Sequence, residues 1–224
     1  MDGLGERTGK TATRGGWKQD PAGVRANIIA VAMAEFARNG LSGARMDEIA
    51  AKTRSSKRMI YYYFGDKEGL YRRVLEEAYR KVRDGEQELD LDHLPPVEAL
   101  RRLVEFTFDH HSQHPDFIRI VMIENVHHAA YMKQSAAIRD VNAGAIRKLE
   151  DICRRGREAG LFRVVDPVEL HWHISALSFF NVSNRATFSG IFGDALFSPE
   201  GQELLREHVV EIVLRYVLKT APGA

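Results

Sequence analysis

Apolar residues recur every three or four positions along most of this chain, the spacing that places them on one face of an α-helix. The first such segment begins at Asp20-Pro21, where an N-cap acceptor precedes a proline at the first helical position. It ends at Asn39-Gly40, and its apolar face is formed by residues four apart, namely Ile28, Ala32 and Phe36. The pattern therefore predicts a long first helix over residues 21–39.

Three more helical segments follow closely, over about 46–52, over about 56–63 and from Asp66 to near Gly85. The second is expected to bury Met46, Ile49 and Ala50. We expect Ser55 or Ser56 to cap the third helix and Asp66 to cap the fourth. Two short helices joined by a tight polar turn, with a longer helix on each side, are typical of a helix-turn-helix unit.

A break in the periodicity over 89–96, with two adjacent prolines, separates these helices from the rest of the chain. Beyond it the pattern predicts helices over 97–114, 116–128 and 132–159, then one from Asp166-Pro167 through Phe180 and one from Ser198-Pro199 to Val217. No strand or repeat signal competes, so we expect an all-α protein. We assign residues 1–19 to a flexible basic tail, 20–88 to a helix-turn-helix domain with its linking fourth helix, and 89–224 to a larger helical bundle.

Charge is distributed unevenly along the 224 residues. Residues 1–73 carry 14 Lys and Arg against 8 Asp and Glu, whereas the remaining 151 carry 18 against 23. A basic N-terminal region favours contacts with phosphates in that region, and the alternative is a chance asymmetry of surface charge. A single cysteine, Cys153, excludes an internal disulfide and fits a reducing cytoplasm. No apolar run reaches the roughly 18 residues that a membrane span needs, so we expect no membrane partner.

At Phe36–Gly40 and from Ile49 through Tyr71 the chain resembles the TetR family of bacterial helix-turn-helix transcriptional regulators. The resemblance is carried by Phe36, Gly40, Ile49, Ala50, Ser56, Lys57, Ile60, Tyr61, Tyr62, Phe64, Lys67, Glu68 and Leu70. The sequence departs from the family pattern at Arg54, where glycine is usual, at Tyr63, where histidine is common, and at Arg58, where a small residue is frequent. The resemblance implies a DNA-binding regulator, usually a repressor, whose C-terminal helices dimerise and bind a small effector.

Several polar side chains near the turn are candidate DNA contacts. Lys57 and Arg58 begin the third helix and are expected to reach base edges, where arginine can bind guanine O6 and N7 through two hydrogen bonds. Arg45 and Lys67 are expected to contact phosphates, and the serine that caps the third helix, Ser55 or Ser56, is a further candidate for a phosphate contact. The resemblance implies contacts at Lys57, Arg58, Tyr61, Tyr62, Tyr63 and Lys67. For each residue, a role in solubility or core packing is the competing interpretation.

One short recognition helix makes too few contacts for specific binding, so we expect a homodimer on a palindromic operator. The last two long helices carry wide apolar faces and are expected to form the dimer interface. The candidate interface residues are Trp172, Leu177, Phe180, Leu205, Val209, Ile212 and Tyr216. The alternative for several of them is a place in the core of one subunit.

An effector pocket among the C-terminal helices is implied by the family resemblance. Apolar residues with a few polar groups could line it, as is usual for such pockets: Phe106, His110, Met122, Ile123, His127, Trp172, Ser175, Phe179 and Asn181. His110 and His114 share a helix face four residues apart, and Asp109 or Glu124 could complete a metal site. We expect no metal there.

Two other functions compete with a ligand-controlled regulator. A metal-dependent enzyme in the C-terminal bundle would use the histidines, but no nucleophile elbow, phosphate loop or cofactor motif occurs. We therefore expect no catalytic residues and no cofactor. A purely architectural DNA-binding protein would not need so long a C-terminal half.

Overall fold

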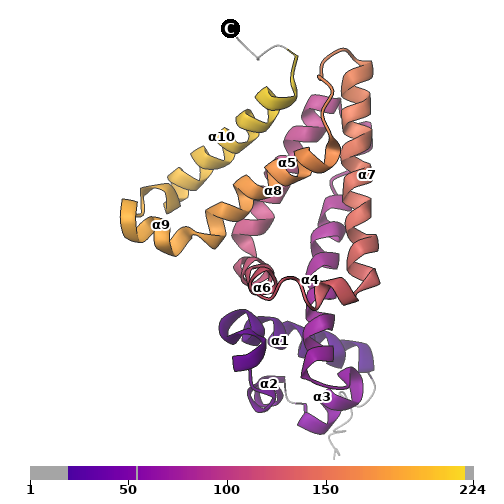
Figure 1. Cartoon of the computed structure of the whole chain (residues 1–224), viewed down its shortest axis with the longest axis vertical. Helices are drawn as coiled ribbons and strands as arrows, with labels where there is room; N and C mark the ends of the chain where they lie inside the picture. The colour runs from indigo at the N-terminus through magenta and orange to yellow at the C-terminus, as the bar shows by residue number, and fades with distance from the viewer. Residues whose placement is uncertain (1–19, 54, 220–224) are drawn as a thin grey trace, which may run out of the picture.

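The computed structural model describes residues 20–53 and 55–219. The predicted tail 1–19 and the turn residue Arg54 lie outside the described residues. In the described part the expected all-α fold is confirmed, with one isolated β-bridge between Phe162 and Leu218. The helices are α1 Pro21–Gly43, α2 Met46–Thr53, α3 Lys57–Phe64, α4 Lys67–Gln87, α5 Pro96–Gln113, α6 Pro115–Val126, α7 Ala136–Glu158, α8 Pro167–Ser183, α9 Arg185–Phe192 and α10 Pro199–Val217 (Figure 1).

Side-chain caps set most of the helix starts where the sequence predicts them. The carboxylates of Asp20, Asp66 and Asp166 each accept backbone N–H groups from the first turn of the helix that follows. Ser198 does the same for α10. The predicted break at Gly40 is present as a residue with φ of 66°, after which α1 continues for a few residues.

Two elements differ from the prediction. The helix expected over 132–159 begins at Ala136, because the Ser135 hydroxyl accepts the N–H of Ile138 and caps α7 there. Met132–Gln134 forms a separate 3₁₀ turn, and the Glu124 carboxylate accepts the N–H groups of Tyr131 and Met132 at 3.3 and 3.0 Å. The sequence prediction also missed α9, a short helix that connects α8 to α10 through a 3₁₀ turn at Ala195–Phe197.

The N-terminal helices α1–α3 pack with the start of α4 into a unit that we call the head. Its apolar core includes Ile28, Phe36, Ile49, Ile60 and Tyr71, and it also takes in Ile120 of α6 and Ile138 of α7. In Figure 1, α6 lies across α1 while α4 rises from the head into the upper helices. The head is therefore packed directly against the first helices of the larger unit.

The C-terminal domain, α5–α10, has its own apolar core between α5, α7, α8 and α10. The Arg206 guanidinium binds the Asp109 carboxylate through Nε and Nη2 at 2.8 and 3.0 Å and fixes α10 against α5. Helices α8 and α10 run beside each other, and α9 connects them at one end (Figure 1). Within residues 20–53 and 55–219, none of the helices is long and apolar enough to cross a membrane.

Candidate DNA-binding surface and effector domain

Helix α3 presents a polar and aromatic face to solvent because its other face is anchored in the head core. Ile60 is fully buried there, while Lys57, Arg58 and Tyr61 on other sides of the helix are exposed. Tyr62 is 79% exposed, an unusual position for a large aromatic side chain. The Ser56 hydroxyl caps the helix by accepting the N–H of Met59 at 3.1 Å. An exposed two-turn helix of this kind has the size and chemistry that enter a DNA major groove.

The remaining predicted DNA contacts lie around this helix and differ in how exposed they are. Arg45 is exposed just before α2. Lys67, in the first turn of α4, donates from Nζ to the Ser42 carbonyl at 3.2 Å. Ser55 is half-buried. Tyr63 is half-buried against the head core, with the Arg25 guanidinium 5.6 Å from its ring centroid. Tyr63 is thus held partly by packing, the alternative expected from the sequence.

An ion pair that the sequence did not predict joins the two helices of the motif. Lys57 Nζ lies 3.0 Å from Oδ1 of Asp47, which is in the first turn of α2. The hydrogen bond and the negative charge of Asp47 raise the pKa of Lys57. Met59, a second residue missed by the sequence analysis, is exposed on α3. No local signal links Asp47 to Lys57, because the helix-turn-helix geometry alone brings them together.

The nine predicted effector residues do not line one common cavity. His110 and Phe179 lie near His111 inside the C-terminal domain. Asn181 and Trp172 line a groove between α8 and α10. His127 is exposed beside the head, in a pocket that also contains Lys67. Helix α6 separates these regions because it lies on α1, which leaves Met122 exposed and packs Ile123 against the head core. Phe106 contacts the α4 end near Gly85, and Ser175 is half-buried on α8.

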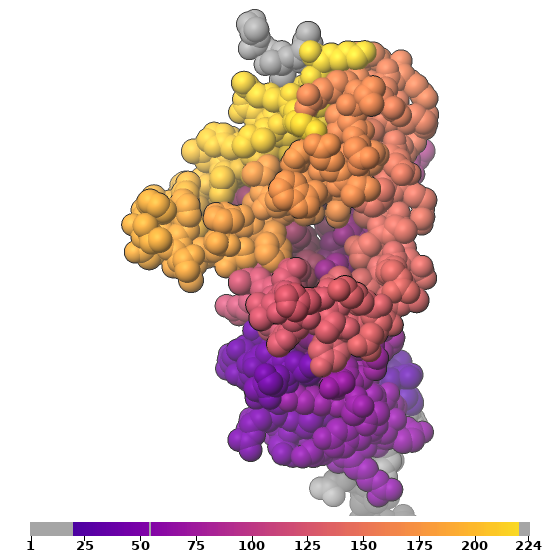
Figure 2. Space-filling model, viewed as in Figure 1, coloured from indigo at the N-terminus to yellow at the C-terminus, as the bar shows by residue number. Residues whose placement is uncertain are grey.

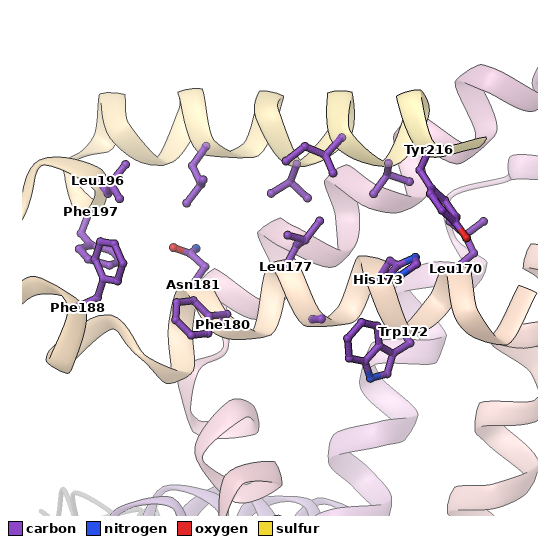
Figure 3. A pocket seen from close by; sticks show the side chains of 15 residues that line it. Leu170, Trp172, His173, Leu177, Phe180, Asn181, Phe188, Leu196, Phe197 and Tyr216 are labelled. Atoms are coloured by element: carbon purple, nitrogen blue, oxygen red, sulfur yellow. The ribbon is translucent and has the colours of Figure 1, made fainter. Parts of the chain in front are cut away.

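The groove between α8 and α10 encloses about 700 Å³ and is almost entirely apolar. Leu177 and Tyr216 lie between the two helices there, and Phe188 and Phe197 line the end near α9 (Figure 3). All seven residues predicted for a dimer interface line it, although Val209 is also buried in the core of the domain. Trp172 is 66% exposed and Ile212 is 53% exposed. Such a patch marks a surface that binds another molecule.

A second polar region, missed by the sequence analysis, is buried between the end of α4 and the helices of the C-terminal domain. Arg83 and Glu86 near the end of α4 form an ion pair, with 9% and 6% of their surfaces exposed. Arg83 Nε also donates to Asn142 Oδ1 of α7 at 3.2 Å. Lys148 Nζ donates to the Glu86 carbonyl at 3.1 Å. Charged groups are seldom buried this deeply without a structural or functional reason.

Three histidines of α5 and α8 lie near enough to Arg83 for its charge to affect them. Burial lowers the pKa of His110, His111 and His171 to about 4, and the positive charge of Arg83 contributes to each shift. All three imidazoles are therefore neutral at pH 7. Among the described residues, Nδ1 of His110, Nδ1 of His111 and Oγ of Ser178 are buried without a hydrogen-bond partner.

The geometry around His110 and His114 does not assemble a metal centre. The two rings stack with centroids 4.2 Å apart, and His114 Nδ1 donates to the His110 carbonyl at 2.9 Å. Asp109 is paired with Arg206, and Glu124 accepts N–H groups of the α6–α7 connection. Over the part of the chain that the structure describes, no group of three or more His, Cys, Asp or Glu side chains is placed to hold a metal.

The exposed recognition helix, the compact head and the helical domain above it define a helix-turn-helix DNA-binding protein. Residues 28–74 match the family model described as bacterial regulatory proteins, tetR family, and residues 96–213 match the tetracycline-repressor-like C-terminal domain. The chain is 33% identical over 210 residues to the HTH-type transcriptional repressor NicS of Pseudomonas putida, covering 93% of this chain and 98% of that protein. The chain belongs to the TetR family of bacterial transcriptional regulators.

Solved structures show the same architecture. The crystal structure of the transcriptional regulator SCO4942 from Streptomyces coelicolor superposes with a TM-score of 0.66 at 26% identity, covering 89% of this chain and 99% of that one. The regulator FadR from Bacillus subtilis, in complex with stearoyl-CoA, gives a TM-score of 0.66 at 18% identity, covering 85% of this chain and 98% of that one. The second likeness concerns the fold alone.

Proposed function

We propose that this TetR-family regulator is a homodimeric repressor that binds a palindromic operator and releases it when a small molecule binds the C-terminal domain. The exposed face of α3 carries the proposal, because Lys57, Arg58, Tyr61 and Tyr62 form one continuous polar and aromatic surface. The identity to the repressor NicS over nearly the full chain supports a repressor rather than an activator.

Dimerisation is supported by the apolar surface of α8 and α10. A single subunit leaves Trp172, Phe180 and Ile212 more than half exposed on one side of the C-terminal domain. Two copies related by a twofold axis would bury this surface in a four-helix contact, with both recognition helices presented to one face of DNA. We place the remaining predicted interface residues Leu177, Leu205, Val209 and Tyr216 at or beneath this contact.

For DNA binding, we assign base contacts to Lys57 and Arg58 and phosphate contacts to Arg45, Ser56, Tyr61 and Lys67. Tyr62 would place its ring against thymine methyl groups or its hydroxyl on a phosphate. Ser55 and Tyr63 are proposed to support the turn and the helix, because both are half-buried in the head. We propose no catalytic role for any residue of the chain.

The test is selection of bound sequences from a random DNA pool at near-physiological salt. The expected result is a palindrome whose half-sites are about one helical turn apart. Enrichment of one unpaired half-site would contradict the dimer, and salt-sensitive binding without any enriched motif would contradict sequence-specific repression.

The dimer is tested separately with Ile212→Glu, which places a charge in the apolar groove. We expect this variant to sediment as a monomer and to lose operator binding. Glu207→Lys is the matched control, since Glu207 is exposed on α10 and does not line the groove. A dimer that survives Ile212→Glu would place the contact on another surface.

A further inference from the structure

We propose that the effector is a small aromatic carboxylate whose anionic group binds Arg83, the position that the Glu86 carboxylate occupies in this structure. The inference rests on the proposed function, since it names the chemistry of the effector that the C-terminal domain would bind. The site is the buried polar cluster between α4, α5, α7 and α8, and it differs from the apolar groove between α8 and α10.

The balance of charge inside the cluster favours an anion. Arg83 and the half-buried Lys148 bring two positive charges, and within the described residues the carboxylate that is hydrogen-bonded to Arg83 is that of Glu86. An unbalanced cation in a low-dielectric interior is costly, so a monoanion that enters the cluster is attracted. A cationic ligand would instead face both Arg83 and Lys148.

Unpartnered polar atoms lie on α5 and α8, two of the helices that bound the cluster. Nδ1 of His110, Nδ1 of His111 and Oγ of Ser178 are buried without partners in the described part of the chain. A neutral imidazole can donate one hydrogen bond, and a serine hydroxyl can donate or accept one. Buried groups of this kind normally have partners, so these three atoms favour a ligand that carries polar groups beside its apolar body.

Aromatic side chains beside the cluster favour a flat apolar body for the ligand. The rings of Phe117 and Phe179 lie 5.9 and 6.5 Å from the His111 ring, measured between centroids. The Phe106 ring lies 5.7 Å from that of His110. An aromatic ring bound among these groups would gain offset or edge-to-face contacts in addition to the burial of its surface.

The cluster has no room for a ligand in this structure. Ligand binding therefore requires a change in conformation. The cavity lined by Glu86, Thr107, Lys148 and His171 has a volume of about 10 Å³, enough for about one water molecule. A hollow bounded by α6, α7 and α8 shows atoms of α4 at its back (Figure 2). A ligand that enters from this side must move α8 or α7 away from α4, and α4 carries that movement to the head.

The Glu86 carboxylate can be displaced from the Arg83 guanidinium by a ligand carboxylate. Burial raises the pKa of the Glu86 carboxyl, with Arg83 opposing that shift. Once a ligand carboxylate replaces it at the guanidinium, Glu86 can take up a proton and remain buried as a neutral group. The Arg83 guanidinium is then paired with a carboxylate both before and after the ligand binds.

The experiment compares benzoate with its neutral isostere benzamide on the full chain, using thermal shift and calorimetric titration. We expect benzoate to bind at least roughly tenfold more tightly than benzamide, since it adds charge-assisted hydrogen bonds to Arg83. Glu86→Gln frees Arg83 of its internal partner and should tighten benzoate binding further. Lys81→Gln is the matched control, because Lys81 is exposed on the same helix and should leave binding unchanged.

Loss of the site is tested with the double variant Arg83→Gln/Glu86→Gln, which removes both charges together and leaves no buried unpaired ion. We expect this variant to fold and to lose the preference for benzoate over benzamide. Equal binding of benzamide, an unchanged response in Glu86→Gln, or benzoate binding that survives the double variant would each overturn the inference. Operator selection without ligand remains the separate test of repressor function, so a palindrome with no benzoate response would overturn only the effector class.

Discussion

The head and the C-terminal domain place their charged residues in opposite ways. In the head, Lys57, Arg58 and Arg45 lie on the surface above an apolar core. At the end of α4, Arg83 and Glu86 are enclosed by helices of the C-terminal domain. Exposed charged side chains can contact a partner such as DNA with little effect on the stability of the fold. Buried charges, by contrast, couple folding, protonation and ligand binding. We therefore propose that the head recognises DNA and that the buried charges belong to the part of the protein that senses the ligand.

The largest expected effect is the loss of folding stability on acidification, which arises from buried histidines of the C-terminal domain. Because the pKa of His110, His111 and His171 is about 4 in the folded chain and about 6.5 when unfolded, the unfolded chain binds more protons between these values. Stability is therefore complete above pH 6.5 and falls as the pH drops toward 4, by up to about 1.4 kcal/mol per pH unit for each histidine.

Urea unfolding at pH 7, 6 and 5 measures this slope. His111→Leu should remove about one third of it, whereas His208→Asn should not, because His208 is exposed on α10. A slope unchanged by His111→Leu would mean that His111 titrates normally in the folded chain.

Breaking the buried ion pair should produce the next largest effect. Arg83→Met leaves the Glu86 carboxylate buried without its cation, which costs about 3–5 kcal/mol. The double variant Arg83→Met/Glu86→Leu should recover most of that loss, because an apolar pair of similar volume avoids the desolvation of both charges. Denaturant unfolding checks both; a single variant as stable as the parent would show that Glu86 is neutral or hydrated.

In the head, Arg58→Ala should change DNA recognition and leave stability nearly intact. Arg58 is exposed, so its loss affects the free energy of unfolding by less than about 0.5 kcal/mol. If it reads guanine, one or two base positions per half-site should lose about 1–3 kcal/mol of discrimination. Repeating the DNA selection with the variant measures this, and an unaltered motif would assign Arg58 to the backbone or to solvent.

The features that the sequence could predict are those that follow from local patterns along the chain. Helix starts at Asp20, Asp66 and Asp166 follow from caps formed within three residues, so local spacing is enough to find them. The recognition helix was also predictable, because the alternation between buried Ile60 and exposed neighbours is a local pattern.

The buried cluster could not be predicted in the same way. Along the chain, Arg83 and Glu86 belong to a charged stretch at the end of α4, a composition typical of a solvated helix end. They are buried because α5, α7 and α8 cover that end, and Asn142 and Lys148 reach them from about 60 residues away. Contacts at such separation leave no periodic signal, which is also why the effector residues proposed from the sequence are scattered over three regions.

The smallest expected effect concerns the ion pair between Asp47 and Lys57. Both side chains are exposed, so solvent screens the pair and it contributes little to stability. Its larger consequence lies in DNA binding, because Asp47 holds the ammonium group of Lys57 and places a negative charge beside the recognition helix. Asp47→Asn should therefore tighten binding to random duplex more than binding to the operator, and so lower the specificity ratio severalfold. Fluorescence titrations at two salt concentrations measure both affinities, with Asp140→Asn on the exposed face of α7 as control. If the two affinities rise equally, Asp47 contributes only general repulsion of phosphate, and the head's surface charges act independently of one another.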